Sequence, residues 1–259
     1  MVETQGPDAE RLAAELGEAI EHQQLQLYYQ PVVSLLDRVA SEVEALLRWP
    51  RNESEILAPS DFIDVAKQFD LLHSLERLVI ETAFEQLSQW RRATDLDISL
   101  NLSERHVYAE GLQQEIRDAA ERNGVATRRL SLEVAESSLA KVDGGRRQRL
   151  EDLSGAGVGL IVDDYSGAIP ASQLSELPLS ALKISRRVVA GIPDNPAHVE
   201  TATTALRLAG ELGLRVIANG VESPGQLAVL REMGCEYGQG FLFSVPMPAE
   251  VLAERAMPR

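Results

Sequence analysis

Cysteine is nearly absent from this 259-residue sequence, in which Cys235 is the single example. One cysteine excludes an intrachain disulfide and a cysteine-based metal site, so Cys235 is interpreted as a small buried apolar residue. Long apolar runs are also missing: none approaches the roughly 20 residues of a membrane span. The N-terminal ten residues lack the pattern of a signal peptide. These absences predict a cytoplasmic protein without membrane insertion.

Positive charge is scarce as well. The chain has 25 Lys and Arg against 40 Asp and Glu, a formal net charge of −15. No block of Lys or Arg forms a basic stripe, so binding to a nucleic acid polymer through its phosphates is not expected. An acidic chain that binds an anionic ligand must do so locally, with metal ions or a few well-placed cations.

The composition favours one large folded domain. Hydrophobic residues make up 44% of the chain, which is ample for a core, and the length suits a single α/β domain. Residues 1–8 are polar and are predicted to form a flexible N-terminus. No convincing linker divides residues 9–259, which are predicted to form a single barrel domain.

Short apolar runs alternate with helical patterns. Strands are expected over residues 27–33, 41–49, 97–103, 130–136, 158–164, 181–185, 215–222 (with the turn that follows) and 238–243. Helices are expected over residues 9–22, 59–67 (capped by Ser60), 73–92, 145–153 and 196–212, with further helices ending near Gly124 and starting at Ser223. The first two strands have a hairpin-length link, which predicts an antiparallel pair. The βα repeats that follow favour an α/β fold, a closed TIM-like (β/α)8 barrel with one antiparallel strand.

Polar side chains recur at the ends of these strands. Catalytic groups of such barrels come from the carboxyl ends of strands, and here those ends supply Glu44, Asn101, Glu133, Asp163, Asp164, Lys183 and Gln239. This oxygen-rich set, without His or Cys, suits Mg²⁺, Mn²⁺ or Ca²⁺ better than zinc. Adjacent aspartates can share a carboxylate between two ions, as in two-metal phosphoester hydrolysis. Each residue alone is more often structural, as a helix cap or a surface lysine, but their coincidence favours a site.

The stretch Ser41–Trp49 adds a second type of group. Alternation along a strand places Glu44, Leu46 and Arg48 on one face. A buried carboxylate is retained when it is paired or binds a cation, and the planar guanidinium of arginine suits phosphate. The alternative is an edge strand with both charges in solvent. The recurrence of polar strand ends down the chain favours the functional interpretation.

The motifs as a set resemble the EAL domain family from about residue 12 to residue 255. They are Tyr29-Gln30-Pro31, Glu44-Ala45-Leu46-Leu47-Arg48-Trp49, Pro59-Ser60-Asp61-Phe62-Ile63, Asn101-Leu102-Ser103, Leu132-Glu133-Val134-Ala135-Glu136, Asp163-Asp164, Leu182-Lys183-Ile184, Gly220-Val221-Glu222 and Gln239-Gly240-Phe241. The resemblance implies a TIM-like barrel with one antiparallel strand and cyclic di-GMP as the ligand. It also implies hydrolysis to linear pGpG with two Mg²⁺ or Mn²⁺ ions.

The resemblance also assigns roles to single residues. Metal ligands would be Glu44, Asn101, Glu133 and Asp163 for the first ion, and Asp163 and Asp164 for the second. Lys183 and Gln239 would orient the water and its surroundings. Arg48 would contact a ligand phosphate, and Gln30 and Leu46 would lie along the dinucleotide.

Two departures from the family pattern bear on function. Asn219 replaces the glutamate of Ala-Glu-Gly-Val-Glu, the residue assigned to the second ion and to water activation. An amide cannot take up a proton at neutral pH and brings no negative charge to an ion. The loop after the aspartates is one residue shorter than the family pattern, has lost glycines and has gained Pro170. Glu136, which anchors this loop in the family, is expected to lack its usual partners.

These departures predict a degenerate EAL domain, most simply a cyclic di-GMP receptor with little or no phosphodiesterase activity. One alternative is an active metal-dependent phosphodiesterase in which Glu222 or a rearranged water replaces the missing glutamate. Another is a ligand-free module that binds a protein partner. A homodimer is a further expectation: Leu71, Leu72 and Val79 either line a dimer face or belong to the core, and the core interpretation is favoured.

Overall fold

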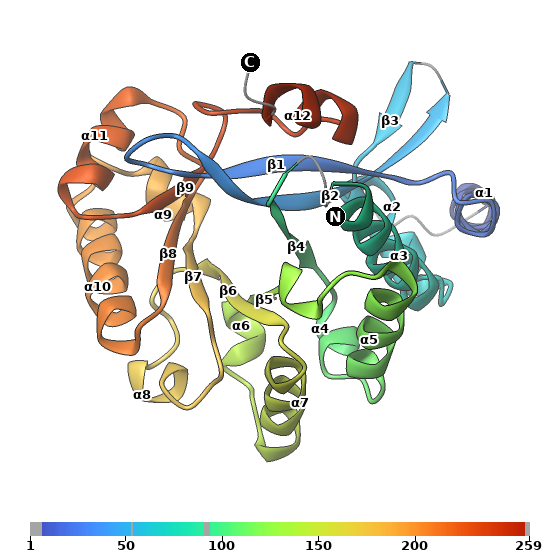
Figure 1. Cartoon of the computed structure of the whole chain (residues 1–259), viewed down its shortest axis with the longest axis horizontal. Helices are drawn as coiled ribbons and strands as arrows, with labels where there is room; N and C mark the ends of the chain where they lie inside the picture. The colour runs from blue at the N-terminus through green and yellow to red at the C-terminus, as the bar shows by residue number, and fades with distance from the viewer. Residues whose placement is uncertain (1–6, 53, 91–93, 257–259) are drawn as a thin grey trace.

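The computed structural model describes residues 7–52, 54–90 and 94–256, and its central feature is a closed barrel of strands (Figure 1). The sheet order is β1-β9-β8-β7-β6-β5-β4-β2-β3, and an additional pairing of β1 with β2 closes it. Strand β3 pairs with β2 alone and stands outside the barrel. The strands are β1 (Gln26–Ser34), β2 (Ala40–Asn52), β3 (Glu55–Leu57), β4 (Asp97–Asn101), β5 (Leu130–Ala135), β6 (Gly159–Tyr165), β7 (Ala181–Ile184), β8 (Arg215–Asn219) and β9 (Tyr237–Gln239).

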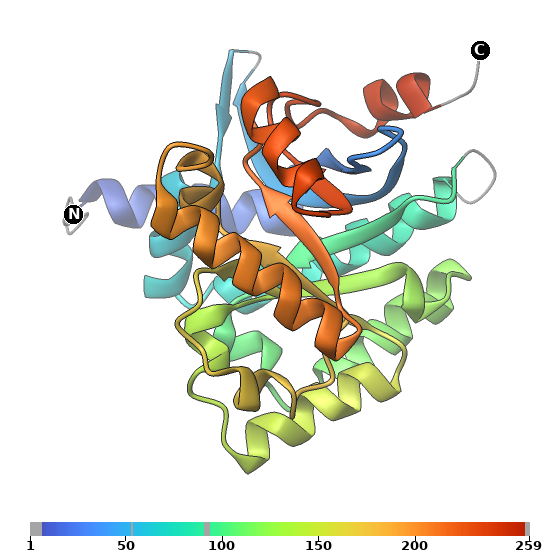
Figure 2. The same cartoon turned by 90° about the vertical axis from the view of Figure 1, so that its left-hand side faces the viewer.

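Helices surround these strands, as the two views in Figures 1 and 2 show. They are α1 (Pro7–Glu21), α2 (Pro59–Gln68), α3 (Leu72–Trp90), α4 (Glu104–Val107), α5 (Leu112–Asn123), the 3-10 turn η1 (Thr127–Arg129), α6 (Glu136–Leu139), α7 (Gly144–Gly155), α8 (Ala171–Leu174), α9 (Arg186–Ala190), α10 (Pro196–Leu212), α11 (Pro224–Glu232) and α12 (Ala249–Ala256). None of the described helices is both long and apolar enough to cross a bilayer.

Strand direction confirms the predicted fold class. β1 runs antiparallel to both of its barrel neighbours, β2 and β9, whereas the pairs from β2–β4 round to β8–β9 are parallel. The link between β1 and β2 is too short for a crossover helix, which forces the reversal. The fold is therefore a TIM-like barrel with one antiparallel strand.

The barrel interior is layered, because side chains two residues apart on a strand share a face. A small apolar cluster fills its middle with Val32, Ile161, Ala181 and Ile217. Lys183 and Asp163 follow Ala181 and Ile161 by two residues on β7 and β6. The polar groups therefore stand one layer above an apolar plug, toward the carboxyl ends of the parallel strands. The larger apolar core includes outward-facing strand residues such as Leu132 and Leu182 and buried helix residues such as Phe84.

Most predicted elements are present with small changes at their ends, and the helix over Pro196–Leu212 has the predicted bounds. Three predictions were wrong in detail. The cap of α2 is Ala58 and not Ser60: the Asp61 carboxylate accepts the Ala58 N–H at 2.8 Å, while Ser60 lies inside the helix. The last strand is Tyr237–Gln239, and the chain beyond Gly240 turns away. The sequence interpretation also omitted β3 and α12.

Two predicted segments, the N-terminal tail and the third helix, extend into residues that the structure does not describe. Helix α1 begins at Pro7, so residues 7 and 8 belong to a helix and not to a flexible tail. Residues 1–6, and residue 92 at the predicted end of the third helix, lie outside the described residues. The flexible N-terminus therefore stays a prediction.

Cys235 and the residues considered for a dimer face lie in or against the hydrophobic core. Cys235 is buried, with 5% of its surface exposed, and burial raises the pKa of its thiol to about 12. Val79 is buried in the main core, while Leu71 and Leu72 pack partly buried against a second cluster around Leu16 and Trp49. These contacts agree with the core interpretation, and the homodimer stays untested.

Candidate functional site

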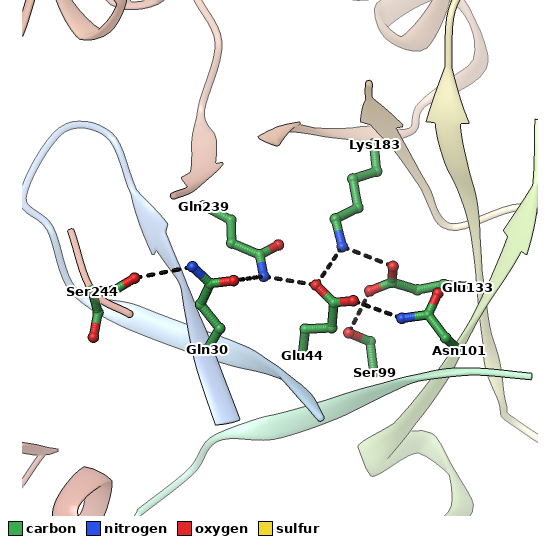
Figure 3. A network of polar contacts seen from close by, with 8 residues as sticks. All are labelled: Gln30, Glu44, Ser99, Asn101, Glu133, Lys183, Gln239 and Ser244. Carbon is green, nitrogen blue, oxygen red and sulfur yellow. Dashed lines mark hydrogen bonds and ion pairs between the residues drawn. The ribbon is translucent and has the colours of Figure 1, made fainter. Parts of the chain in front are cut away.

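A connected network of polar groups, most of them buried, lies at the barrel mouth (Figure 3). Its centre is Glu44 on β2, which is 8% exposed. The Gln239 side-chain amide donates to Glu44 Oε2 at 2.7 Å and also approaches Gln30 Oε1 at 3.0 Å. The Gln30 amide donates in turn to the Ser244 carbonyl at 3.0 Å. Strand β1 thus reaches the site because its residue Gln30 pairs with Glu44 in the antiparallel ladder.

Lys183 is the only buried positive charge of this network. Its ammonium group lies 2.8 Å from Glu44 Oε2 and 2.7 Å from Glu133 Oε2, and the residue is 1% exposed. Burial by itself lowers the pKa of Lys183, but Glu133 and Glu44 outweigh that effect and raise it. The lysine is therefore a permanent cation that ties β7 to β2 and β5. The alternative of a surface lysine is wrong.

The two carboxylates beside Lys183 differ in acidity. Burial followed by the charge of Glu44 raises the pKa of Glu133 to about 8. For Glu44 burial acts in the same direction, but Lys183, Gln239 and Asn101 outweigh it and lower its pKa. Near neutral pH, Glu44 is ionised and Glu133 tends to hold a proton. A bound cation at these oxygens would reverse that tendency, because it favours the ionised form.

Asn101 and Ser99 orient the two carboxylates from β4. Asn101 Nδ2 donates to Glu44 Oε1 at 2.6 Å, so the amide oxygen is not used in this bond. Ser99 Oγ donates to Glu133 Oε1 at 2.7 Å. Sequence reasoning missed Ser99 and Ser244. The signal for Ser99 was its place two residues before Asn101 on the same strand face, whereas nothing local marks Ser244.

The two aspartates lie in an irregularity of β6. Between Val162 and Tyr165 the strand has one more residue than its partner β7, and Asp164 adopts a positive φ of 54°. A β-bulge of this type changes the direction of side chains and often lies beside a functional site. Asp163 is half-buried, its Oδ1 is a buried atom without a hydrogen-bond partner, and burial raises its pKa. Asp164 is exposed.

Glu136 anchors the loop after the aspartates. Its Oε2 accepts the Ser166 N–H at 2.9 Å and the Ser166 hydroxyl at 2.8 Å, while Oε1 accepts the N–H groups of Ala168 at 2.8 Å and Ile169 at 3.1 Å. Glu136 therefore has four partners in this loop, and the expectation that they differ from its usual partners in the family stays a prediction. Three of the four donors are backbone N–H groups, which do not depend on residue type, and the fourth is the Ser166 hydroxyl.

We expect Glu136→Ala to loosen this loop. Hydrogen bonds to a charged acceptor contribute about 1.5–3 kcal/mol each, so amide hydrogen exchange at Ala168 and Ile169 should accelerate by about 10- to 100-fold. The matched control is Glu176→Ala, since Glu176 forms an exposed pair with Arg147. Unchanged exchange at Ile169 in Glu136→Ala would show that the loop holds its shape by packing alone.

Other predicted site residues lie apart from the network or at its rim. Asn219, half-buried at the end of β8, pairs with Gln239 in the parallel ladder. Glu222 is exposed and bonds to Arg186 at 2.6 Å, so it does not join the network. Arg48 is half-buried, and its guanidinium donates to the Leu47 carbonyl at 2.7 Å.

A cavity of about 1300 Å³ adjoins the barrel mouth. Leu46 and Asn101 belong to its wall together with side chains of α2, α3 and α4, among them Ile63 and His106. Its volume is sufficient for a ligand of several rings. The structure thus places a largely apolar cavity directly beside the carboxylate and lysine network.

The sequence as a whole matches one family model. The model described as "EAL domain" matches residues 13–246. The chain belongs to the EAL domain family. The resemblance stated from the motifs is thereby confirmed, whereas degeneracy of this member is a separate question.

Relatives and solved structures agree with this assignment. The cyclic di-GMP phosphodiesterase NbdA of Pseudomonas aeruginosa is 36% identical over 94% of this chain and 32% of its own length. The bifunctional diguanylate cyclase/cyclic di-GMP phosphodiesterase MucR of the same organism is 33% identical over 93% of this chain and 36% of its own length. The structure of "PaMucR Phosphodiesterase, c-di-GMP complex" has a TM-score of 0.88 and 33% identity, covering 93% of this chain and 99% of that one. This chain thus spans about a third of the length of these curated relatives.

The donor set of this EAL domain can be tested against a divalent metal ion. Glu44, Glu133 and Asp163 supply carboxylates, and Asn101 supplies an amide oxygen, all ligands that Mg²⁺ and Mn²⁺ accept. The buried, unpaired Asp163 Oδ1 is an observation that a cation would explain. These residues fit a first ion. A second ion would have Asp163 and Asp164, but Asn219 in place of a carboxylate.

Proposed function

We propose that this EAL domain binds cyclic di-GMP and acts as a receptor or regulatory domain with little or no phosphodiesterase activity. The observation that carries the proposal is Asn219 at the end of β8, beside Gln239 of the polar network. A glutamate there could take a proton from water and add a charge to an ion, and an asparagine can do neither. The remaining polar set is still assembled.

The groups expected to meet the ligand are of two kinds. Arg48 carries the charge that suits a phosphate, while Gln30 and Leu46 would lie along the dinucleotide. The cavity beside Leu46 supports this placement, since it offers apolar surface for a base. The similarity to a phosphodiesterase solved in complex with c-di-GMP is the reason for naming that ligand.

A metal ion would be held by Glu44, Asn101, Glu133 and Asp163, with Asp164 contributing to a second ion. When bound, Mg²⁺ or Mn²⁺ supplies positive charge to a phosphate and lowers the pKa of a coordinated water. The chain's own residues have other tasks. Lys183 holds Glu44 and Glu133 in place, and Gln239 joins Glu44 to Gln30.

Active hydrolysis is the second candidate, because relatives such as NbdA and MucR are named phosphodiesterases. In that case Glu222 would have to replace the missing glutamate, and it would first have to leave Arg186. A ligand-free module that binds a protein partner is the third. Cyclic di-GMP binding separates this third function from the first two, and product formation separates the first two from each other.

Calorimetric titration of cyclic di-GMP into the purified chain, once with Ca²⁺ to block turnover and once with EDTA, tests the proposal. We expect binding at micromolar concentration or tighter. Arg48→Met should weaken it by about 10- to 100-fold, the loss of one charge-assisted hydrogen bond of about 1.5–3 kcal/mol. Arg51→Met is the matched control on the same strand, because Arg51 pairs with Glu15. Absence of binding in both conditions would remove the receptor and the enzyme and leave the protein-interaction module.

A further inference from the structure

A second group of potential metal ligands lies outside the barrel mouth, where three helices meet. His73 on α3, His106 on α4 and Glu115 on α5 place one ligand atom each within 4.8 Å of one another. Helices α3 and α5 pack side by side (Figure 1), and His106 of α4 contacts Glu76 of α3 and Glu115 of α5. The contacts are His106 Nε2 to Glu115 Oε2 at 3.2 Å and His73 Nε2 to Glu115 Oε1 at 3.8 Å.

The group has the supporting carboxylate that metal-binding histidines usually have. His106 Nδ1 lies 3.1 Å from Glu76 Oε2, and both side chains are buried. Glu76 is itself held by the Ser103 N–H at 2.5 Å and the Ser103 hydroxyl at 3.1 Å. A carboxylate behind one ring nitrogen places the proton there and leaves the lone pair of the other nitrogen for a metal. His106 Nε2 therefore faces Glu115 and His73 as a potential ligand.

The distances suit a small tetrahedral ion. Bonds of about 2.0–2.2 Å from zinc to nitrogen or oxygen place ligand atoms about 3.3–3.6 Å apart. The contacts of 3.2 Å and 3.8 Å lie near that range, although they end on different Glu115 oxygens, and the three ligand atoms as a set lie within 4.8 Å of one another. The His73 side chain is 58% exposed and can close the remaining gap by a change of rotamer, while the His106 side chain is 2% exposed and fixed.

We propose that His73, His106 and Glu115 form a binding site for Zn²⁺ or a similar transition metal ion, distinct from the oxygen-rich set at the barrel mouth. Two imidazole nitrogens and one carboxylate are a ligand set typical of zinc, whereas Mg²⁺ prefers oxygen alone. Three protein ligands leave a fourth position open. His73 and His106 also line the cavity of about 1300 Å³.

The same residues have another explanation that needs no metal. A protonated His106 could donate to Glu76 and Glu115 at once and simply join α3, α4 and α5. In that case His73 would contribute little, since its contact with Glu115 is the longest and it is the most exposed member. The dependence of metal binding on His73 therefore separates the two explanations.

The test is a titration of Zn²⁺ into the metal-stripped chain against a chromophoric chelator, with millimolar Mg²⁺ present to compete at oxygen ligands. We expect one bound equivalent. Glu76→Gln should weaken the affinity for Zn²⁺ about 10- to 100-fold, as loss of a carboxylate behind a ligating histidine does. His73→Gln should weaken this affinity at least as much. With Co²⁺ in place of Zn²⁺, wild type should show visible absorption bands that His73→Gln lacks.

Two controls keep the result specific. His22→Gln replaces an exposed histidine elsewhere, and Asp163→Asn removes a carboxylate of the barrel mouth. Both variants should still bind one equivalent of Zn²⁺ and show the visible absorption bands with Co²⁺. Because His73 is exposed, its variant should fold as wild type does, which circular dichroism checks. Binding that is unchanged in His73→Gln, or that is lost in Asp163→Asn instead, would overturn the proposal, as would the absence of any bound Zn²⁺.

Discussion

Asn219→Glu is expected to raise the rate of pGpG formation from cyclic di-GMP with Mn²⁺ by about 10²- to 10⁴-fold, the contribution typical of a general base. Asn219 ends β8 opposite Gln239, so a glutamate there would stand beside the polar network. The backbone around it is suited to hold the new side chain. Gly220, with φ of 81°, makes the following turn, and its N–H donates to the Gln239 carbonyl at 2.8 Å.

Asn219→Gln is the matched control for this gain. Glutamine has the length of glutamate but neither its charge nor its ability to accept a proton, so its rate should stay at the wild-type level. The measurement is chromatographic separation of pGpG from cyclic di-GMP over time. Rapid turnover by the wild type, with no increase in Asn219→Glu, would contradict the proposed loss of catalysis and direct attention to Glu222.

Lys183→Met is expected to lower the free energy of unfolding by about 3–5 kcal/mol at pH 8 in EDTA, the cost of removing one partner from a buried ion pair. Lys183 lies within 2.8 Å of both Glu44 and Glu133, all three buried. Without the ammonium group, two carboxylates remain close together in a region that water does not reach. Methionine fills a similar volume, so the loss reports charge more than packing.

The loss should be smaller at pH 5 than at pH 8. Burial acts to raise the pKa of Glu44 and Lys183 outweighs it in the wild type, so removal of the lysine should raise this pKa above its ordinary 4.5. A carboxyl whose pKa is raised in the folded state destabilises that state increasingly as pH climbs from the unfolded value to the folded one. At pH 5 most of this penalty is absent because the Glu44 carboxyl of Lys183→Met is then largely protonated. The raised pKa of Glu133, about 8, weakens wild type and variant alike between pH 5 and pH 8, so it cancels from the difference.

Denaturant unfolding at both pH values measures this effect. Lys67→Met is the matched control, because Lys67 is exposed and its 3.1 Å contact with Asp64 should contribute less than about 1 kcal/mol. If the free energy of unfolding falls as little in Lys183→Met as in the control, or falls equally at pH 5 and pH 8, the network tolerates two unpaired carboxylates.

Much of this protein could be predicted from local patterns. Short apolar runs located the barrel strands, although the last was predicted to extend too far along the chain, and the short link after Ser34 predicted the antiparallel pair. Period-two geometry is a property of the extended backbone, so it survives in any tertiary context. The same regularity predicted that Glu44, Glu133 and Lys183 would meet at one end of the barrel. Their order along the chain was also sufficient to identify the family.

Contacts between segments that are distant in the sequence could not be predicted from local patterns. The contact of Ser99 with Glu133 and the β6 bulge at the two aspartates depend on strand register. Of the four bonds that hold the loop on Glu136, three come from backbone N–H groups, which carry no sequence signal, and one from the Ser166 hydroxyl.

The group at His73, His106 and Glu115 shows the difference between local pattern and tertiary packing. No spacing motif in the sequence marks this group, and only the packing of three helices brings its members together. The sequence by itself determined the barrel strands and the polar residues at their ends, because a short apolar run and the polar residue that ends it are local features of the chain. The tertiary structure alone decided which groups touch, because contact distance depends on register and packing between segments far apart in the chain.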